Sequence, residues 1–395
     1  MITQLIQENK IEIFFQPIVS IKNKKIFAFE ALTRAYDENN DFISPMYLFE
    51  QAKKENISHT LDSYVRELAL EKFIPYHKKN KEVLLFLNFE SSFIDSEEYD
   101  TFITTVKKYN ICSSNIVLEI KEDEIKDNHS IKKFVDLYRK NGFIIAIDDF
   151  GTGYSSFDRL SLIKPDIVKM DRSLIFNINQ NFINSEILTA VSNMCHKIGA
   201  IVLAEGVEEK KEILSCMEKD IDIFQGFYFS KPKKDVDLNL NTHLLKSIED
   251  IGVHYKQNIS DIINNKKLLH KESQNLSKEI SHLFNASHNT ITQEVKKIIA
   301  KHKKLEAIYT IEFTTGIQKN DTIINVKENT LFNATKDGHD HTLKEYYFIA
   351  KNSSRCDYLS GTYVSRASGN MCITYSSITM IQGIKYILCL DIKTS

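Results

Sequence analysis

The chain has 395 residues, which is enough for one large and one smaller domain. Its apolar content of 42% supports a packed core, but no apolar run reaches the length of a membrane-spanning helix. The net charge of −2 argues against a DNA-binding surface, so an anionic ligand must be bound by local cations.

The N-terminal residues and the cysteines predict a protein of a reducing compartment. The first 15 residues lack the basic start and the apolar stretch of a signal peptide. The six cysteines show no CxxC spacing, so we expect small buried thiols and no structural zinc. A cytoplasmic protein is therefore expected.

The first part of the chain alternates apolar runs with amphipathic stretches. Runs 11–19 and 24–32 are separated by only four residues, which predicts an antiparallel hairpin. Later apolar runs lie at 83–89, 116–120, 143–150, 166–171, 200–206 and 222–229, and most are separated by helical patterns. This alternation predicts parallel strands with right-handed crossovers. We expect an α/β fold, a (β/α)8 TIM-like barrel with an antiparallel first strand; an open doubly wound sheet is the alternative.

Polar side chains close these apolar runs. They are Glu30, Asn88, Glu119, Asp148, Asp149, Lys169, Glu205 and Gln225. In a barrel such residues converge on one rim, and acids at the ends of buried strands require a metal or a cation. Oxygen ligands of this kind suit Mg²⁺ or Mn²⁺, so the pattern indicates a divalent-metal hydrolase.

Several of these residues have more than one interpretation. Asp149 points away from Asp148 unless the backbone turns, which Gly151 permits. Lys169 lies in a strand and needs a partner, either a rim carboxylate or the attacking water and phosphoryl oxygens. Glu205 is a metal ligand, the base that orients water, or both.

Two further residues are candidates for ligand contacts. Arg34 could grip a phosphate with two hydrogen bonds, or form a surface ion pair. Gln225 could hydrogen-bond an acid or water at the site, or be a satisfied core amide.

Eight segments in order resemble the EAL-domain family, the phosphodiesterases of the bacterial second messenger cyclic di-GMP. They are QPI at 16–18, EAL at 30–32 with Arg34, LFLN at 85–88, EIKE at 119–122, DDFGTGYSS at 148–156, KMD at 169–171, AEGVE at 204–208 and QGFYFSKP at 225–232. The resemblance covers about residues 1–235 and implies hydrolysis of cyclic di-GMP to the linear dinucleotide pGpG with two Mg²⁺ or Mn²⁺ ions. It also implies a homodimer. A catalytically weak cyclic di-GMP receptor or a signalling scaffold is the alternative.

The resemblance implies a role for each matched residue. The metal ligands would be Glu30, Asn88, Glu119, Asp148 and Asp149, and the catalytic residues Lys169 and Glu205. Substrate would be bound by Gln16, Arg34 and Gln225, and the loops supported by Glu122, Asp171 and Glu208. The chain departs from the family at Glu90, Lys121 and Glu209, of which Glu90 and Lys121 add charge near the rim.

The pattern of apolar residues changes after residue 240. Residues 241–307 carry apolar side chains at spacings of three and four, which predicts one or two long helices with a break at 285–289. Residues 308–395 predict a small α+β domain with strands at 307–314, 342–350, 357–365, 371–381 and 383–392. We expect residues 1–240 to form the barrel, 241–307 a helical linker and 308–395 a PAS- or Cache-like sensor for a small ligand or a protein partner.

Overall fold

The computed structural model describes residues 1–89, 94, 99–121, 127–152, 157–234, 240–286, 291–325, 334–365 and 368–394. Glu90 and Glu122 lie outside these residues. The chain divides into two compact units, Met1–Ile259 and Ser260–Ser395. Within the described part of the chain, no helix is both long enough and apolar enough to cross a membrane.

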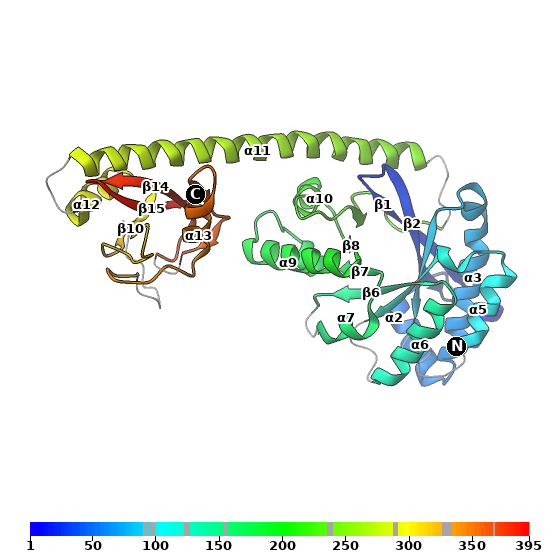
Figure 1. The fold of residues 1–395 in the computed structure, drawn as a ribbon. Helices are drawn as coiled ribbons and strands as arrows, with labels where there is room; N and C mark the ends of the chain where they lie inside the picture. The colour runs from blue at the N-terminus through cyan, green and yellow to red at the C-terminus, as the bar shows by residue number, and fades with distance from the viewer. Residues whose placement is uncertain are drawn as a thin grey trace. The chain divides into compact units, whose positions relative to one another are not determined.

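A closed barrel forms the centre of the first unit (Figure 1). Its described strands are β1 (Ile11–Ser20), β2 (Lys25–Tyr36), β4 (Leu84–Phe89), β5 (Ile116–Lys121), β6 (Ile144–Phe150), β7 (Ile167–Met170), β8 (Ile201–Ala204) and β9 (Ile223–Gln225). The strand order is β1-β9-β8-β7-β6-β5-β4-β2, and β1 also pairs with β2, which closes the ring. The short β3 (Phe42–Ile43) adds to β2 outside this ring.

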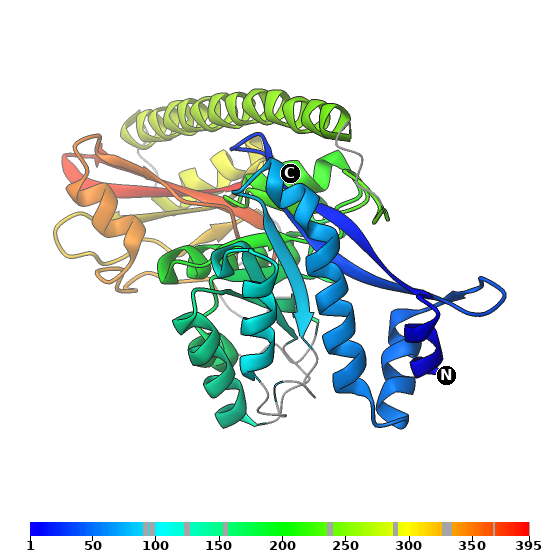
Figure 2. The same cartoon turned by 90° about the vertical axis from the view of Figure 1, so that its right-hand side faces the viewer.

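The strand directions confirm the predicted barrel. β1 is antiparallel to both β2 and β9, whereas the pairs from β2 to β9 through the rest of the ring are parallel. Figure 2 shows β1 and β2 as the hairpin predicted from their short connection. The ring is closed, so the alternative of an open doubly wound sheet is wrong.

Helices cover the outside of the barrel. In the described part of the unit they are α1 (Ile2–Gln7), α2 (Pro45–Lys54), α3 (Ser58–Lys79), α5 (Tyr99–Lys108), α6 (Asn128–Lys140), α7 (Phe157–Ile163), α8 (Arg172–Ile175), α9 (Phe182–Ile198) and α10 (Lys210–Met217). Helix α6 shows why they form. The carboxylate of Asp127 accepts hydrogen bonds from the first amides of α6, and Ile131, Phe134, Val135 and Tyr138 recur at helical spacing and are buried.

The inside of the barrel is a separate apolar layer, to which every strand of the ring contributes one buried side chain. These residues are Ile18, Ala28, Phe86, Val117, Ala146, Ile167, Leu203 and Ile223. Because side chains alternate across a strand, the residue two positions further on faces the interior again. This layer therefore fixes which residues face the mouth of the barrel.

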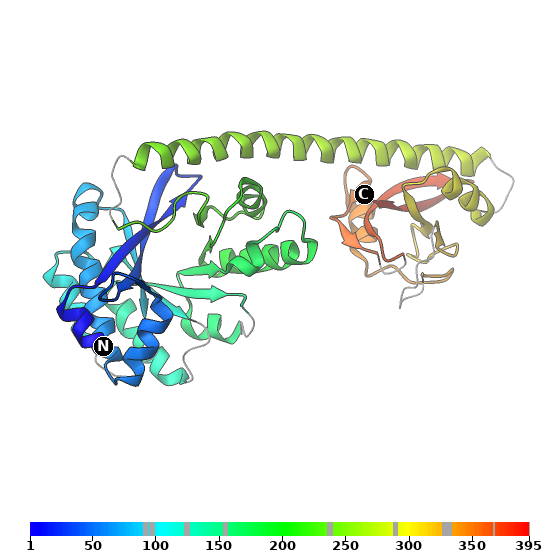
Figure 3. The same cartoon turned by 180° about the vertical axis from the view of Figure 1, so that it is seen from behind.

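The second unit is built on an antiparallel sheet in the order β11-β10-β15-β14-β12, with β13 paired to β14. Its described strands are β10 (Leu305–Glu312), β11 (Ile323–Ile324), β12 (Asp357–Leu359), β13 (Tyr363–Val364), β14 (Met371–Ile381) and β15 (Ile384–Lys393). Helices α11 (Leu240–Ala286) and α12 (Ile291–Lys301) precede the sheet, as predicted. Figure 3 shows the C-terminal part of α11 beside the red strands of this sheet. Ile280 and Phe284 of α11 share a core with Leu388 and Leu390 of β15.

One predicted strand of this unit is wrong. Residues 342–350 were expected to form a strand, but α13 (Glu345–Asn352) occupies most of this segment. Tyr347 and Ala350, three residues apart, are both buried and pack with Tyr309 and Ile387 on the face of the sheet. Consecutive aromatic residues favour a strand locally, and packing of one helical face outweighs that preference here.

Candidate active site

A ring of eight polar side chains lies one layer above the apolar interior. Each follows the interior residue of its strand by two positions, or precedes it by two in the reversed strand β1. The ring consists of Gln16, Glu30, Asn88, Glu119, Asp148, Lys169, Glu205 and Gln225. The alternation of side chains along the strands thus brings the polar residues predicted from the strand ends to one place.

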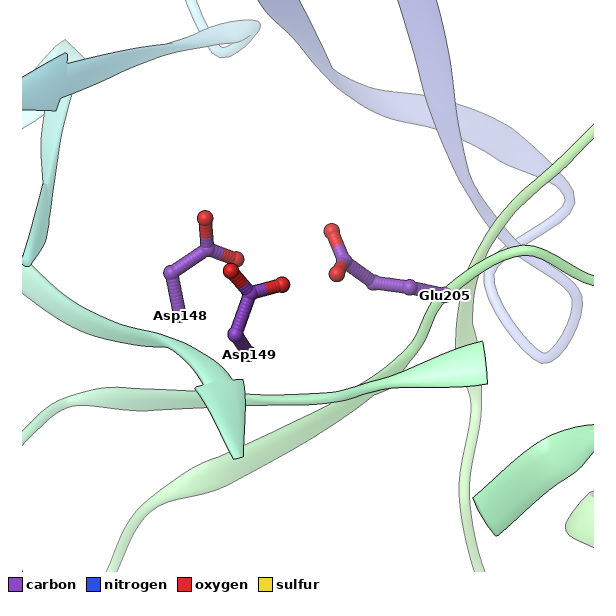
Figure 4. Close-up of side chains that lie close together, drawn as sticks. All are labelled: Asp148, Asp149 and Glu205. Atoms are coloured by element: carbon purple, nitrogen blue, oxygen red, sulfur yellow. The ribbon is translucent and has the colours of Figure 1, made fainter. Parts of the chain in front are cut away.

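Asp149 joins this ring through an unusual backbone conformation. Its φ is 57°, and the pairing of β6 with β7 shifts register between Ile147 and Phe150. The turn therefore lies at Asp149 itself, before Gly151. As a result, carboxylate oxygens of Asp148, Asp149 and Glu205 lie within 4.8 Å of one another, and the three side chains converge in Figure 4. Aspartate is one of the few residues besides glycine that adopt this conformation at low cost.

Lys169 lies among four carboxylates. Its Nζ is 2.8 Å from Asp148 Oδ1, 2.6 Å from Glu205 Oε1 and 3.8 Å from Glu30 Oε2, and it also pairs with Glu119. Burial alone would lower the pKa of Lys169, but the four carboxylates outweigh burial and raise it. The lysine is therefore a fixed cation at neutral pH.

The environment of the ring disfavours the ionised form of several of its acids. Burial, reinforced by the neighbouring acids, raises the pKa of Glu119 well above its usual range, and burial raises that of Glu205. Burial and the charge of Asp148 raise the pKa of Asp149 to about 6. One lysine does not neutralise this number of carboxylates in a water-poor site.

Glu30 is held by two amides. Asn88 Nδ2 donates to Glu30 Oε1 over 3.0 Å, and Gln225 Nε2 donates to Glu30 Oε2. Gln225 Nε2 also lies 3.1 Å from Gln16 Oε1, and Gln16 Nε2 donates to the carbonyl of Ser230 over 3.1 Å. These amides orient the Glu30 carboxylate, and substrate binding by Gln16 and Gln225 stays a prediction.

The donor set fits a divalent cation. Among the described residues, four buried oxygens accept no hydrogen bond: Glu119 Oε1, Glu119 Oε2, Asp148 Oδ1 and Gln225 Oε1. Two of them, Glu119 Oε1 and Asp148 Oδ1, form ion pairs with the Lys169 ammonium. Unsatisfied carboxylate and amide oxygens with no sulfur or imidazole among them match the preferences of Mg²⁺ and Mn²⁺.

A cavity of about 670 Å³ opens beside the ring. Glu30 and Asn88 line it from the barrel, and Arg34, half-buried at the far end of β2, lines it as well. Arg34 Nη1 donates to the carbonyl of Thr33 over 2.8 Å. The cavity thus joins one acid of the ring, Glu30, to a guanidinium in a space large enough for a small ligand.

One charged pair on the wall of this cavity was not predicted from the sequence. Asp62 and Arg66 of α3 are both buried and form an ion pair, and the Arg66 guanidinium lies 4.4 Å from the centre of the Phe89 ring. Their spacing of four residues within a helical pattern was the available signal.

Asp171 and Glu208, two of the residues expected to support loops, lie outside the ring. Asp171 Oδ1 accepts from the Ser173 amide over 2.8 Å at the start of α8. Glu208 pairs with Arg172 at 2.9 Å on the surface. Glu209, one of the residues that depart from the family pattern, donates its backbone amide to Glu212 Oε2 over 3.1 Å at the start of α10. Asp171 thus caps α8 after β7 and Glu208 forms an ion pair after β8, and support of the loops by Asp171, Glu208 and Glu122 stays a prediction.

The barrel with its reversed first strand and the polar ring at its mouth together define a barrel of the EAL type. The EAL domain model matches residues 1–232, and the chain belongs to this family. Over 236 residues it is 29% identical to the probable cyclic di-GMP phosphodiesterase PdeG of Escherichia coli, a match covering 59% of this chain and 46% of that protein. The chain therefore spans about half the length of this relative.

Solved structures show the same fold. The Bacillus subtilis YkuI protein, in complex with cyclic di-GMP and calcium, aligns over 100% of this chain and 99% of that chain, with a TM-score of 0.78 and 20% identity. Klebsiella pneumoniae BlrP1, in a complex with manganese and cyclic di-GMP, is 27% identical, with a TM-score of 0.51 over 57% of this chain and 56% of that one. The likeness to YkuI includes the second unit, whose assignment as PAS- or Cache-like stays a prediction.

Proposed function

We propose that this chain hydrolyses one phosphodiester bond of cyclic di-GMP and releases the linear dinucleotide pGpG. The observation that carries the proposal is the convergence of Asp148, Asp149 and Glu205 within 4.8 Å, in a ring whose other acids are buried. Such a set is costly for a purely structural site, because repulsion and burial oppose its ionisation.

Each residue of the ring has a proposed role. Glu30, Asn88, Glu119, Asp148 and Asp149 would hold two Mg²⁺ or Mn²⁺ ions. Such ions, when bound, lower the pKa of coordinated water and offset charge on the phosphate. Lys169 supplies a fixed positive charge beside the reacting phosphate, and Glu205 holds the attacking water or an ion. Arg34 binds a phosphate oxygen from the cavity wall.

A turnover assay tests this proposal. The full chain is mixed with cyclic di-GMP and Mn²⁺ or Mg²⁺, and the products are separated by chromatography. We expect metal-dependent formation of pGpG and at least about a 100-fold loss of rate in Glu119→Gln, because replacing even a residue behind the ligands costs 10–100-fold. Glu82→Gln is the matched control, since Glu82 is 77% exposed and pairs with Lys25 before β4 begins.

A cyclic di-GMP receptor, the alternative function, would give a different result when binding is measured beside turnover. If the protein binds cyclic di-GMP tightly by calorimetry but forms no pGpG at any metal concentration, it is a receptor and the enzymatic proposal fails. If it neither binds nor hydrolyses cyclic di-GMP, both assignments fail.

We also propose that the second unit regulates the barrel through α11. Leu244, Ile248 and Ile251 of this helix belong to the core of the first unit, and Ile280 and Phe284 belong to the core of the second. A helix that contributes to two cores can couple their stabilities. Replacing Gly252 by proline, which interrupts the helix between the two sets, would leave activity unchanged if no coupling existed. A homodimer and a ligand or protein partner of the second unit remain proposals.

A further inference from the structure

Lys121 is a charged residue of the barrel mouth that the proposed mechanism does not yet use. It is the last residue of β5 and follows Glu119 by two positions, so its side chain stands on the same face, one layer closer to the mouth. It is half-buried and lines the 670 Å³ cavity together with Glu30, Arg34 and Asn88.

The pairing of β5 with β6 fixes where Lys121 stands. Its Cα is the register partner of Asp148, the residue that precedes the left-handed turn at Asp149. Lys121 therefore stands at the end of β5 beside Asp148 of the neighbouring strand, whereas Lys169 lies among the carboxylates of the ring.

The charge of the cavity makes this position important. Acids dominate the ring, so an anionic ligand is repelled unless cations of the wall receive it. The Arg66 guanidinium, which lines the cavity from α3, pairs with Asp62, and Lys53 of α2 lines the cavity as well. Arg34 and Lys121 are the cations that line the cavity from the barrel strands in the described part of the chain.

We propose that Lys121 binds a non-bridging oxygen of the phosphodiester that is cleaved and so determines the affinity for substrate. This inference rests on the proposed function. Hydrolysis adds water across one P–O bond, which leaves a phosphate monoester and a hydroxyl group. The monoester carries more negative charge than the diester, so the same ammonium binds the linear product more strongly than the substrate.

Steady-state kinetics of the full chain test this role. In Lys121→Met we expect KM for cyclic di-GMP to rise about tenfold, the equivalent of one charge-assisted hydrogen bond, with kcat unchanged or higher. Product inhibition by pGpG should weaken by at least the same factor. Lys121→Arg, which keeps the charge, should restore most of the affinity. Lys140→Met is the matched control, because Lys140 is an exposed lysine at the end of α6, away from the cavity.

The outcomes separate this inference from the proposed function. A KM within twofold of the parent protein in Lys121→Met overturns the inference, and so does a change confined to the Mn²⁺ concentration that gives half-maximal rate. If the parent protein binds cyclic di-GMP without turnover, calorimetry of the two proteins with Ca²⁺ replaces kinetics, and equal dissociation constants overturn the inference. Thermal unfolding of each variant shows that a lost affinity is not a lost fold.

Discussion

Replacing Lys169 by methionine removes the cation at the centre of the ring while keeping an unbranched side chain of similar length. Four carboxylates then lose their common partner, including Asp148 at 2.8 Å and Glu205 at 2.6 Å. Removing one partner of a buried ion pair costs about 3–5 kcal/mol. We expect the metal-free variant to lose this much free energy of unfolding at pH 8, measured by chemical denaturation.

The loss should depend on pH with a definite sign. The carboxyls of Glu119 and Glu205 have pKa values raised by burial, and that of Asp149 is raised to about 6. A carboxyl whose pKa is raised on folding destabilises the fold above that pKa, and the penalty disappears as the pH falls through it towards the unfolded value. The destabilisation of Lys169→Met should therefore shrink between pH 8 and pH 5.

Added Mn²⁺ should also restore stability at pH 8, because an ion replaces the missing positive charge. Denaturation curves of Lys169→Met are measured with and without Mn²⁺, and the same curves of Lys140→Met serve as the control. A loss of equal size at pH 5 and pH 8, with or without Mn²⁺, would mean that Lys169 contributes packing rather than charge.

Three further predictions concern the same rim. Glu119→Gln should raise the unfolding free energy of the metal-free protein by about 1–3 kcal/mol at pH 8 while lowering turnover at least about 100-fold, because Lys169 keeps three other carboxylate partners and the repulsion among the buried acids falls; a destabilised variant would contradict this. Asp149→Asn and Asp149→Ala should both lose activity, but the alanine variant should be less stable by about 1 kcal/mol because its φ is positive, and equal melting temperatures would refute the backbone argument. Gly226→Ala should cost at least about 2 kcal/mol, because its Cβ would lie 2.0 Å from the Val207 carbonyl oxygen, and an unchanged melting temperature would show that the loop moves freely.

The barrel and most of its site could be predicted from the sequence because both follow from alternation. The apolar runs fix the strands, and the short connection before Lys25 fixes the reversed first strand. Side chains alternate between the two faces of a strand, and this alternation decides which residues face the barrel interior. The inward positions of Glu30 and Glu119 can therefore be predicted without any tertiary information.

Other features depend on contacts between distant segments. A rule of alternation places Asp149 on the wrong side, because the backbone turns at that residue. The hydrogen bonds among Gln16, Glu30 and Gln225 join residues up to 209 positions apart in the sequence. The helix at Glu345–Asn352 forms because the sheet offers an apolar face for Tyr347, which local propensity does not register.

The two-position step from the apolar layer to the polar ring has a consequence for insertions and deletions. Adding or removing one residue between Phe86 and Asn88, for example, would turn the amide out of the barrel and an apolar side chain into it. The same change in the connection before a strand, such as the turn at 141–142 that precedes β6, does not alter which side chains of the strand face the interior. Length variation in related chains should thus be tolerated between the helices and strands and excluded from the few residues that separate the two layers.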